Sequence, residues 1–296
     1  MMELKEKVLN APFRWAGSKK RVLNDILKFF DDTKKNYIEC FLGSGVVLIN
    51  LLNNSDVKKY DNYYVNDINP HIINFYLELK NNCNQLIRNV ESLAEKYNDL
   101  PTNDKEKMYY EIRTEFNSFT RYSIKQTSYF YFLMKTCFNG VYRENKYKKF
   151  NVPFGRKEKI NIDRNNLIEL SKLIQNVSFY NMDYKKFLNE MRKENVIDNS
   201  FIYCDPPYLP DDLLVYQKQM LYTVDSFDHN SFVEELKNIK KSKFIVSMSD
   251  SKIADSIYKD GGLEKYELMD IVRVINPRRI FPSKEVIFSN FIIKKE

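Results

Sequence analysis

The stretch NYIECFLGSGVVLINLL, residues 36–52, decides the fold. Its first part, 36–41, is short and largely apolar or aromatic, which predicts a buried strand. Gly43 and Gly45 then permit a tight turn, and the apolar run after them begins a helix whose amino end favours negative charge. Turns of this kind are common in α/β proteins, so the motif alone leaves ligand binding and simple chain reversal both open.

Strands and helices alternate outward from this unit. We expect further strands at 63–67, 177–183, 200–205, 243–250 and 285–293, and amphipathic helices at 21–30, 74–90, 167–175, 184–194 and 231–241. Such alternation predicts an α/β protein with a mostly parallel, doubly wound sheet. The alternation breaks at 76–164, which is helical and then basic and aromatic. We therefore expect 1–75 and 165–296 to form one domain and 76–164 to form an inserted second one.

The composition is that of a globular protein with a basic surface. The chain has 296 residues, 43% of them hydrophobic, and a formal net charge of +7. This charge is compatible with a polyanionic partner and equally with a lysine-rich surface. Many of the 21 Tyr and 21 Phe residues lie among Lys and Arg, as in YRENKYKKF at 142–150. Rings beside cations suit bases and phosphates, although core packing beside a solvated edge is the plainer explanation.

Several classes of protein are disfavoured. The four cysteines show no CxxC spacing, which predicts neither a disulfide framework nor a zinc site. With only two histidines, metal chemistry and histidine-dependent acid–base chemistry are not expected. The amino terminus lacks an apolar signal region and no stretch is long enough to cross a membrane, so we expect a soluble cytoplasmic protein with reduced thiols.

Acidic residues follow the expected strands at the sheet edge where α/β proteins bind ligands. Asp67 ends the second strand, 22 positions after Gly45. That spacing is typical of an acid that holds a ribose, and a helix cap is the alternative. Asp183 can likewise cap a helix or reach a purine amino group. Both GxGxxG and GxxxxGK[ST] are absent, which favours a nucleoside without phosphates.

The fourth strand ends in the string DPPY, which consists of Asp205, Pro206, Pro207 and Tyr208. The two prolines stiffen the turn, and the carbonyls of the turn can then accept hydrogen bonds from a ligand. A rigid surface turn would explain the prolines, but it would explain neither the acid nor the aromatic ring.

Six strings in this order closely resemble the Dam-like DNA adenine-N6 methyltransferases of the D12 class: WAGSK, ECFLGSG, VNDINP, FNGVYRENKYKKFNVPFGR, NMDY and DPPY. DPPY also serves enzymes that methylate RNA or protein glutamine, whereas FNG-x-x-R followed by FNVPFG is far more specific to the DNA family. The resemblance implies a site-specific enzyme that transfers a methyl group from S-adenosylmethionine to N6 of a flipped adenine, without a metal.

The resemblance also implies roles for individual residues. Asp205 and the Pro206 carbonyl would accept hydrogen bonds from N6, Pro207 would stiffen the loop, and Tyr208 would stack on the adenine. The residues expected to contact S-adenosylmethionine are Trp15, Lys19, Gly43, Gly45, Asp67, Asp183 and Asp205. Those expected to read bases or hold the strand are Arg14, Asn139, Arg143, Pro153 and Arg156. The segment 76–164 would be the target-recognition domain, mainly helical and carrying a β-hairpin.

The expected partner is double-stranded DNA, and the protein is expected to act as a monomer. GATC is the leading target that the resemblance implies, with longer sites containing GAT as the alternative. A cognate restriction endonuclease and a solitary epigenetic role both stay open. Two rival hypotheses are an RNA or protein amino-methyltransferase of the same fold and a sequence-specific DNA-binding protein that has lost catalysis.

Overall fold

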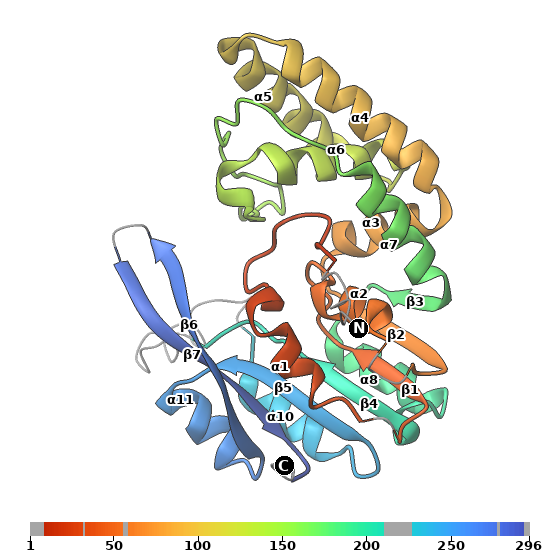
Figure 1. Cartoon of the computed structure of the whole chain (residues 1–296), viewed down its shortest axis with the longest axis vertical. Coiled ribbons are helices and arrows are strands. Elements are labelled where there is room, and N and C mark those ends of the chain that lie inside the picture. The colour runs from red at the N-terminus through yellow and green to blue at the C-terminus, as the bar shows by residue number, and fades with distance from the viewer. Residues whose placement is uncertain (1–8, 32, 56–58, 210–226, 277–278, 293–296) are drawn as a thin grey trace, which may run out of the picture. The chain divides into compact units, whose positions relative to one another are not determined.

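The computed structural model describes residues 9–31, 33–55, 59–209, 227–276 and 279–292 (Figure 1). The chain divides into two compact units. The first unit consists of 1–18, 43–55 and 69–181, and the second consists of 19–42, 56–68 and 182–296. The whole of the expected insertion, 76–164, lies within the first unit.

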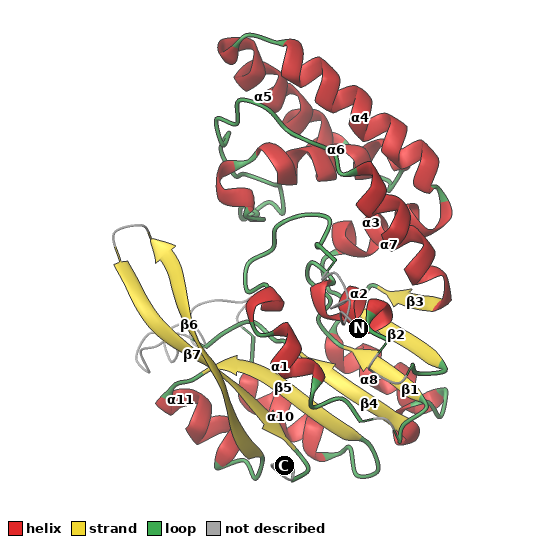
Figure 2. Ribbon diagram, in the orientation of Figure 1, coloured by secondary structure: helices red, strands yellow, loops and turns green. Residues whose placement is uncertain are grey.

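The second unit is built on a mixed sheet (Figure 2). Its strands are β1 (Asn36–Glu39), β2 (Asn62–Asn66), β4 (Ser200–Cys204), β5 (Lys243–Ser249), β6 (Glu264–Asn276) and β7 (Arg279–Ser289). They lie in the order β2-β1-β4-β5-β7-β6. The other described strand, β3 (Val177–Tyr180), belongs to the first unit. The pairs β1–β2, β1–β4 and β4–β5 are parallel, whereas β7 is antiparallel to both β5 and β6.

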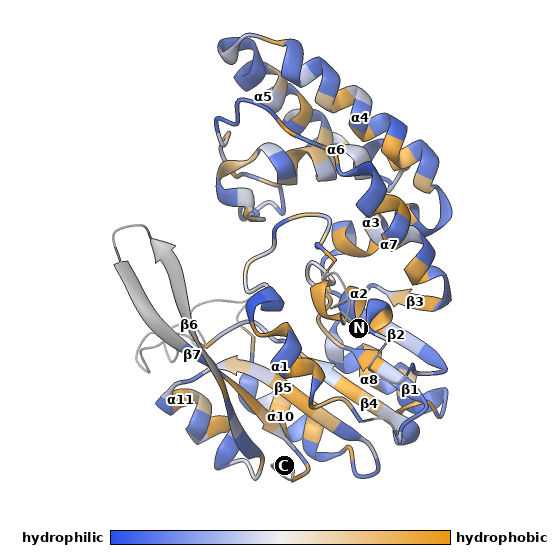
Figure 3. Cartoon of the chain, in the orientation of Figure 1, coloured by the Kyte–Doolittle hydropathy of each residue, from blue (hydrophilic) through white to orange (hydrophobic). Residues whose placement is uncertain are grey.

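The parallel strands reverse their order between β1 and β4, where Ile38 lies opposite Ile202 and Glu39 lies opposite Tyr203. Open α/β sheets bind ligands at the carboxyl ends of the strands beside such a switch point. β4 is buried at every position, and Figure 3 shows apolar stretches along β4 and β5. A parallel strand covered on both faces requires such an unbroken apolar run.

The helices of the second unit are short. Among the described residues of this unit they are α1 (Leu23–Leu27), α8 (Tyr184–Lys193), α10 (His229–Lys237) and α11 (Lys252–Ala254), with the turns η1 (Lys19–Arg21), η4 (Ile197–Asn199) and η5 (Asp255–Lys259). α8 presents Phe187, Leu188 and Met191 as its buried stripe, the pattern expected of a helix packed on a core.

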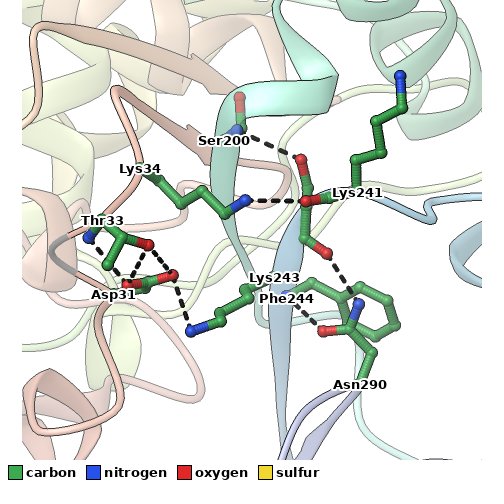
Figure 4. Close-up of polar contacts among 9 residues, drawn as sticks. Asp31, Thr33, Lys34, Ser200, Lys241, Lys243, Phe244 and Asn290 are labelled. Atoms are coloured by element: carbon green, nitrogen blue, oxygen red, sulfur yellow. Dashed lines mark hydrogen bonds and ion pairs between the residues drawn. The ribbon is translucent and has the colours of Figure 1, made fainter.

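The amino ends of β4 and β5 are held by polar contacts (Figure 4). Asp31 accepts from the Thr33 amide at 2.9 Å and forms an ion pair with Lys243 at 3.0 Å. The Asn290 side chain accepts from the Phe244 amide at 2.8 Å and donates to the Ser242 carbonyl at 2.8 Å. These contacts brace the edge of the sheet that lies away from the carboxyl ends of the strands.

The first unit is helical. Its elements are α2 (Val46–Asn53), α3 (Pro70–Asn81), α4 (Cys83–Asp99), α5 (Thr102–Ser118), α6 (Ile124–Thr136) and α7 (Arg164–Leu173), with η2 (Phe138–Gly140), η3 (Ile174–Asn176) and β3. Aromatic rings fill its core: Phe75 stacks on Tyr131, with 5.4 Å between ring centroids, and Phe13 meets Phe75 edge to face. None of the described helices is long and apolar enough to cross a membrane.

The expected α/β fold is confirmed, and the first part of 76–164 is helical as expected, in α4, α5 and α6. Several bounds differ from those expected, and three elements differ most. The helix expected at 74–90 is two helices, α3 and α4, which meet at Asn82. The last expected strand begins earlier, as β7, and ends before Asn290. β6 was not expected, because Lys265, Glu267 and Asp270 interrupt the apolar pattern that predicts a strand.

Candidate functional site

A buried ion pair holds the loop after β4. Lys19 Nζ lies 2.6 Å from Asp205 Oδ1, and it also donates to the Tyr208 hydroxyl. The Lys19 side chain is 2% exposed and that of Asp205 is 21% exposed. Because an unpaired buried ammonium costs several kcal/mol, Lys19 depends on this carboxylate. The fold therefore brings together three residues from two separate motifs, WAGSK and DPPY.

Tyr208 is held from a second direction by Glu285 of β7. The Tyr208 hydroxyl donates to Glu285 Oε1 at 2.9 Å, and Glu285 is 2% exposed. Lys19 Nζ also lies 4.5 Å from the centroid of the Tyr208 ring. The sequence predicts no role for Glu285, because its only signal is an acid at the start of an apolar segment.

The backbone of Pro207 forms a hydrogen bond with the side chain of His229, the first residue of α10. This contact raises the pKa of His229, but burial outweighs it and lowers that pKa to about 4. His229 Nδ1 lies 2.6 Å from the Tyr258 hydroxyl oxygen. A neutral imidazole has one N–H, so His229 donates to the Pro207 carbonyl and accepts from Tyr258. The small number of histidines in the sequence predicted no such role for His229.

Glu39, the last residue of β1, is a buried acid that the sequence analysis did not single out. Burial raises the pKa of Glu39 well above its usual range, and the charges of Asp205 and Asp67 raise it further. Its carboxyl is 2.8 Å from the Tyr37 hydroxyl. Its place in the strand expected at 36–41 was readable from the sequence, but its burial and its position beside the switch point were not. Because Glu39 favours its protonated form, there is no third negative charge beside the two aspartates.

Asp67 is 9% exposed and follows β2 directly. It does not cap the next helix: Asn69 does, accepting from the His71 amide at 2.9 Å, with Pro70 at the first helical position. The helix-cap alternative for Asp67 is therefore wrong. Asp183, in contrast, does cap α8, because its Oδ1 accepts from the Lys185 amide at 2.9 Å. A role for Asp183 at a purine stays a prediction.

The glycine turn lies in the first unit, where Trp15 and Tyr76 cover it. Gly43 has φ +52°, and a Cβ there would lie 3.1 Å from Trp15 Cδ1. Gly45 has φ +71°, and a Cβ there would overlap the Tyr76 hydroxyl, which donates to the Ser44 carbonyl at 2.5 Å. Both glycines are thus required by backbone conformation and by close packing.

The expected cofactor residues divide between the units. Trp15, Gly43 and Gly45 lie in the first unit, and Lys19, Asp67, Asp183 and Asp205 lie in the second. In the second unit, Asp67 and Asp205 both act on Glu39 electrostatically. This acid-lined edge suits a cationic ligand. No group of three or more metal-ligating side chains is found among the described residues.

The five expected DNA-contact residues all lie in the first unit, on or beside a ribbon at 137–155. Isolated antiparallel bridges join Cys137 to Phe154 and Glu144 to Phe150, which is the expected hairpin in a loosely paired form. Arg14 packs over Gly140, where a Cβ would lie 3.1 Å from Arg14 Cβ.

The other four residues present different faces of this ribbon. Asn139 is exposed with φ +55°. Arg143 Nε donates to Asn151 Oδ1 at 2.8 Å, which fixes the direction of an exposed guanidinium. The Pro153 carbonyl accepts from Phe138 at 2.9 Å, so Pro153 anchors the ribbon. Arg156 is exposed and has no ion pair or hydrogen bond from its side chain within the described part of the chain.

A polar cavity of about 210 Å³ opens beside the ribbon in the first unit. Its cationic lining comes from Arg121, Lys148 and Lys149, and its rings include His71 and Tyr142. Burial lowers the pKa of His71 to about 4, so this ring is neutral near pH 7. Cations beside aromatic rings suit the backbone and bases of a nucleic acid.

Comparison with known proteins assigns the chain to a family. Residues 15–275 match the family model of the D12 class N6 adenine-specific DNA methyltransferases. The chain is 32% identical to the type II methyltransferase M.MjaIII of Methanocaldococcus jannaschii, over 91% of this chain and 92% of that protein. It is 30% identical to the DNA adenine methylase of Haemophilus influenzae, over 96% and 95% of the two chains. The type II methyltransferase M1.LlaDCHI of Lactococcus lactis is 29% identical over 89% of each chain.

Proposed function

The chain belongs to the D12 class of N6 adenine-specific DNA methyltransferases, and from this membership we propose that it methylates a flipped adenine within GATC or a GAT-containing site of duplex DNA. S-adenosylmethionine is the proposed methyl donor, with no metal. The observation that carries the proposal is the buried pair of Lys19 and Asp205 at the end of β4, beside the switch point of the sheet.

The proposed catalytic group is the loop Asp205–Tyr208. The lone pair of adenine N6 is delocalised into the ring, so the nitrogen must be steered toward tetrahedral geometry before it attacks. The Asp205 carboxylate and the Pro206 carbonyl are suited to accept the two N6–H bonds. Because Lys19 and His229 already hold this loop, the acceptors are in place before substrate arrives.

Tyr208 would supply the face on which the flipped adenine stacks. Flipping costs a few kcal/mol, and stacking on an aromatic ring offsets roughly 1 to 3 kcal/mol of it. Its hydroxyl is engaged by Lys19 and Glu285, so the ring is held at its hydroxyl end.

The residues of the second unit fit S-adenosylmethionine. When bound, this cofactor would supply a methyl group on a positively charged sulfur. Asp205 and Asp67 provide negative charge. Glu39 favours its protonated form and so adds no third negative charge. Asp67 would hold the ribose hydroxyls, with its helix-cap role already taken by Asn69. Asp183 would contact the adenine, and Trp15, Lys19, Gly43 and Gly45 would complete the set.

We assign 76–164 to target recognition and the remainder, 1–75 and 165–296, to catalysis. Arg143 would read a guanine, because its guanidinium is exposed and oriented by Asn151. Arg14, Asn139 and Pro153 would position the strand, and Arg156 would bind a phosphate. We propose that the enzyme acts as a cytoplasmic monomer, either with a cognate restriction endonuclease or alone.

The test is to express the chain in a host that lacks adenine methylation and to sequence the genomic DNA by a method that reports N6-methyladenine. We expect one motif containing GAT to be methylated throughout, and the Asp205→Asn variant, produced at the same level, to leave it unmodified. Methylation of an unrelated motif would overturn the proposed target. Unmodified DNA, with methyl transfer to RNA or protein instead, would overturn the proposed substrate.

A further inference from the structure

Glu285 is a buried acid, and the proposed mechanism gives it no role of its own. It lies on β7 opposite Ser249 of β5, and the next three residues of β7 are apolar and buried. A carboxylate in such a place costs free energy unless it accepts hydrogen bonds. Its Oε1 accepts one from the Tyr208 hydroxyl at 2.9 Å.

The hydrogen-bond directions at Tyr208 follow from the chemistry of its partners. An ammonium group can only donate, so the Tyr208 oxygen accepts from Lys19. The Tyr208 hydroxyl proton is then directed to Glu285, which can accept it as a carboxylate. Asp205, Lys19, Tyr208 and Glu285 thus form one chain of hydrogen bonds in this order. It begins at Asp205 in the loop and ends at Glu285 on β7.

We propose that Glu285 is a positioning residue of the methyl-transfer reaction, which sets the orientation of Tyr208 by accepting its hydroxyl proton. Lys19 contacts both Tyr208 and Asp205, so a shift of Tyr208 is transmitted to the carboxylate. The inference rests on the proposed stacking role of Tyr208. Glu285 itself touches neither the adenine nor the methyl group in this scheme.

The test is a double-mutant cycle between Tyr208→Phe and Glu285→Ala, measured as methyl transfer to genomic DNA from a host lacking adenine methylation. Such DNA makes the assay independent of the exact target site. We expect each single variant to lower kcat roughly ten- to a hundredfold with little change in the KM for S-adenosylmethionine. The double variant should lose no more than Tyr208→Phe alone, because that substitution already removes the contact with Glu285.

Two variants show whether the effect is specific. Glu285→Gln keeps an acceptor oxygen and should retain most of kcat. Glu267→Gln makes the same change on β6, opposite Val286, where the acid is 61% exposed and pairs with Lys284. It should leave kcat unchanged.

Losses that multiply in the double variant would overturn the inference, and so would full activity of Tyr208→Phe. The second result stands even if Glu285→Ala fails to fold, since Tyr208→Phe removes the same hydrogen bond from the other side. Tyr208→Ala distinguishes the positioning role of Glu285 from the stacking role of Tyr208. Normal turnover of Tyr208→Ala would overturn the stacking role itself, whereas an inactive Tyr208→Ala beside additive Glu285 and Tyr208→Phe effects would overturn only the positioning role.

Discussion

Lys19 and Asp205 are 186 positions apart in the sequence, and the Lys19 ammonium donates to the Asp205 carboxylate at 2.6 Å. Lys19 comes from the short turn η1, and Asp205 follows the central strand β4. One buried cation therefore links two motifs that lie far apart in the sequence. The link makes Asp205 both the proposed catalytic acceptor and a structural partner.

The double role of Asp205 predicts that two substitutions will separate activity from stability. Asp205→Asn keeps the shape of the side chain but removes its charge, so methyl transfer should fall below detection while the protein stays folded. Asp205→Ala removes the partner of Lys19 altogether, and breaking a buried pair costs up to about 3 to 5 kcal/mol. Thermal unfolding and tritiated methyl transfer measure the two effects.

The matched control for Asp205 is Asp25→Asn, which breaks an ion pair with Lys28, whose side chain is 73% exposed. An exposed pair contributes about 0 to 1 kcal/mol, so activity and melting temperature should barely change. Normal turnover by Asp205→Asn would remove Asp205 from the proposed mechanism.

Replacing Arg143 by Ala should relax sequence choice more than it weakens general DNA affinity. A bidentate contact between arginine and guanine gives roughly 1 to 3 kcal/mol of discrimination. Arg156→Ala should instead lower affinity for all sequences and reduce the salt dependence of binding by about one counterion. The measurement is binding to target and scrambled duplexes at several salt concentrations.

Arg88→Ala on the exposed surface of α4 is the control for both arginine variants, because no DNA role is proposed for it. If Arg143→Ala leaves the ratio of target to scrambled affinity unchanged, Arg143 does not read a base.

Gly45→Ala should be more destabilising than Gly262→Ala. Both glycines have positive φ, at +71° and +93°, so both substitutions carry backbone strain of roughly 1 to 2 kcal/mol. A Cβ at Gly262 meets no atom within 4 Å, whereas a Cβ at Gly45 would overlap Tyr76. Urea unfolding of the two variants measures the difference, and equal losses would show that Tyr76 can move aside.

The free energy of unfolding should fall as the pH drops from about 6.5 to about 4, because burial lowers the pKa of both His71 and His229 to about 4. Above the ordinary histidine pKa of 6.5, both states are neutral and these groups contribute nothing. Below it, the unfolded chain binds protons that the folded chain does not bind, at a cost of about 2 kcal/mol per histidine at pH 5.

His71→Phe tests this pH dependence without touching the loop after β4. The ring of His71 lies among Phe116, Phe130 and Tyr142, so an apolar ring is a conservative replacement. Urea unfolding at pH 7 and pH 5 should show a smaller loss for this variant than for the wild type. An unchanged loss would mean that His71 is protonated in the folded chain.

Local patterns in the sequence predicted much of the fold. The strand, glycine turn and helix at 36–52 appeared as β1, a turn with two positive φ values and α2, because each depends on residues that are neighbours in the chain. The junction of α3 and α4 at Asn82 was missed, because the apolar spacing runs across it without a glycine or proline.

By itself, the sequence determined the alternation of strands and helices, the motifs at the strand ends and, through their order, the D12 class. Only the tertiary structure decided which of those residues meet: Lys19 with Asp205, Tyr208 with Glu285, and His229 with Pro207. It also decided that Glu39 favours the protonated form and that Asn69, not Asp67, caps α3. The reason is physical, since charge states and hydrogen-bond partners depend on burial and on distances between groups remote in sequence.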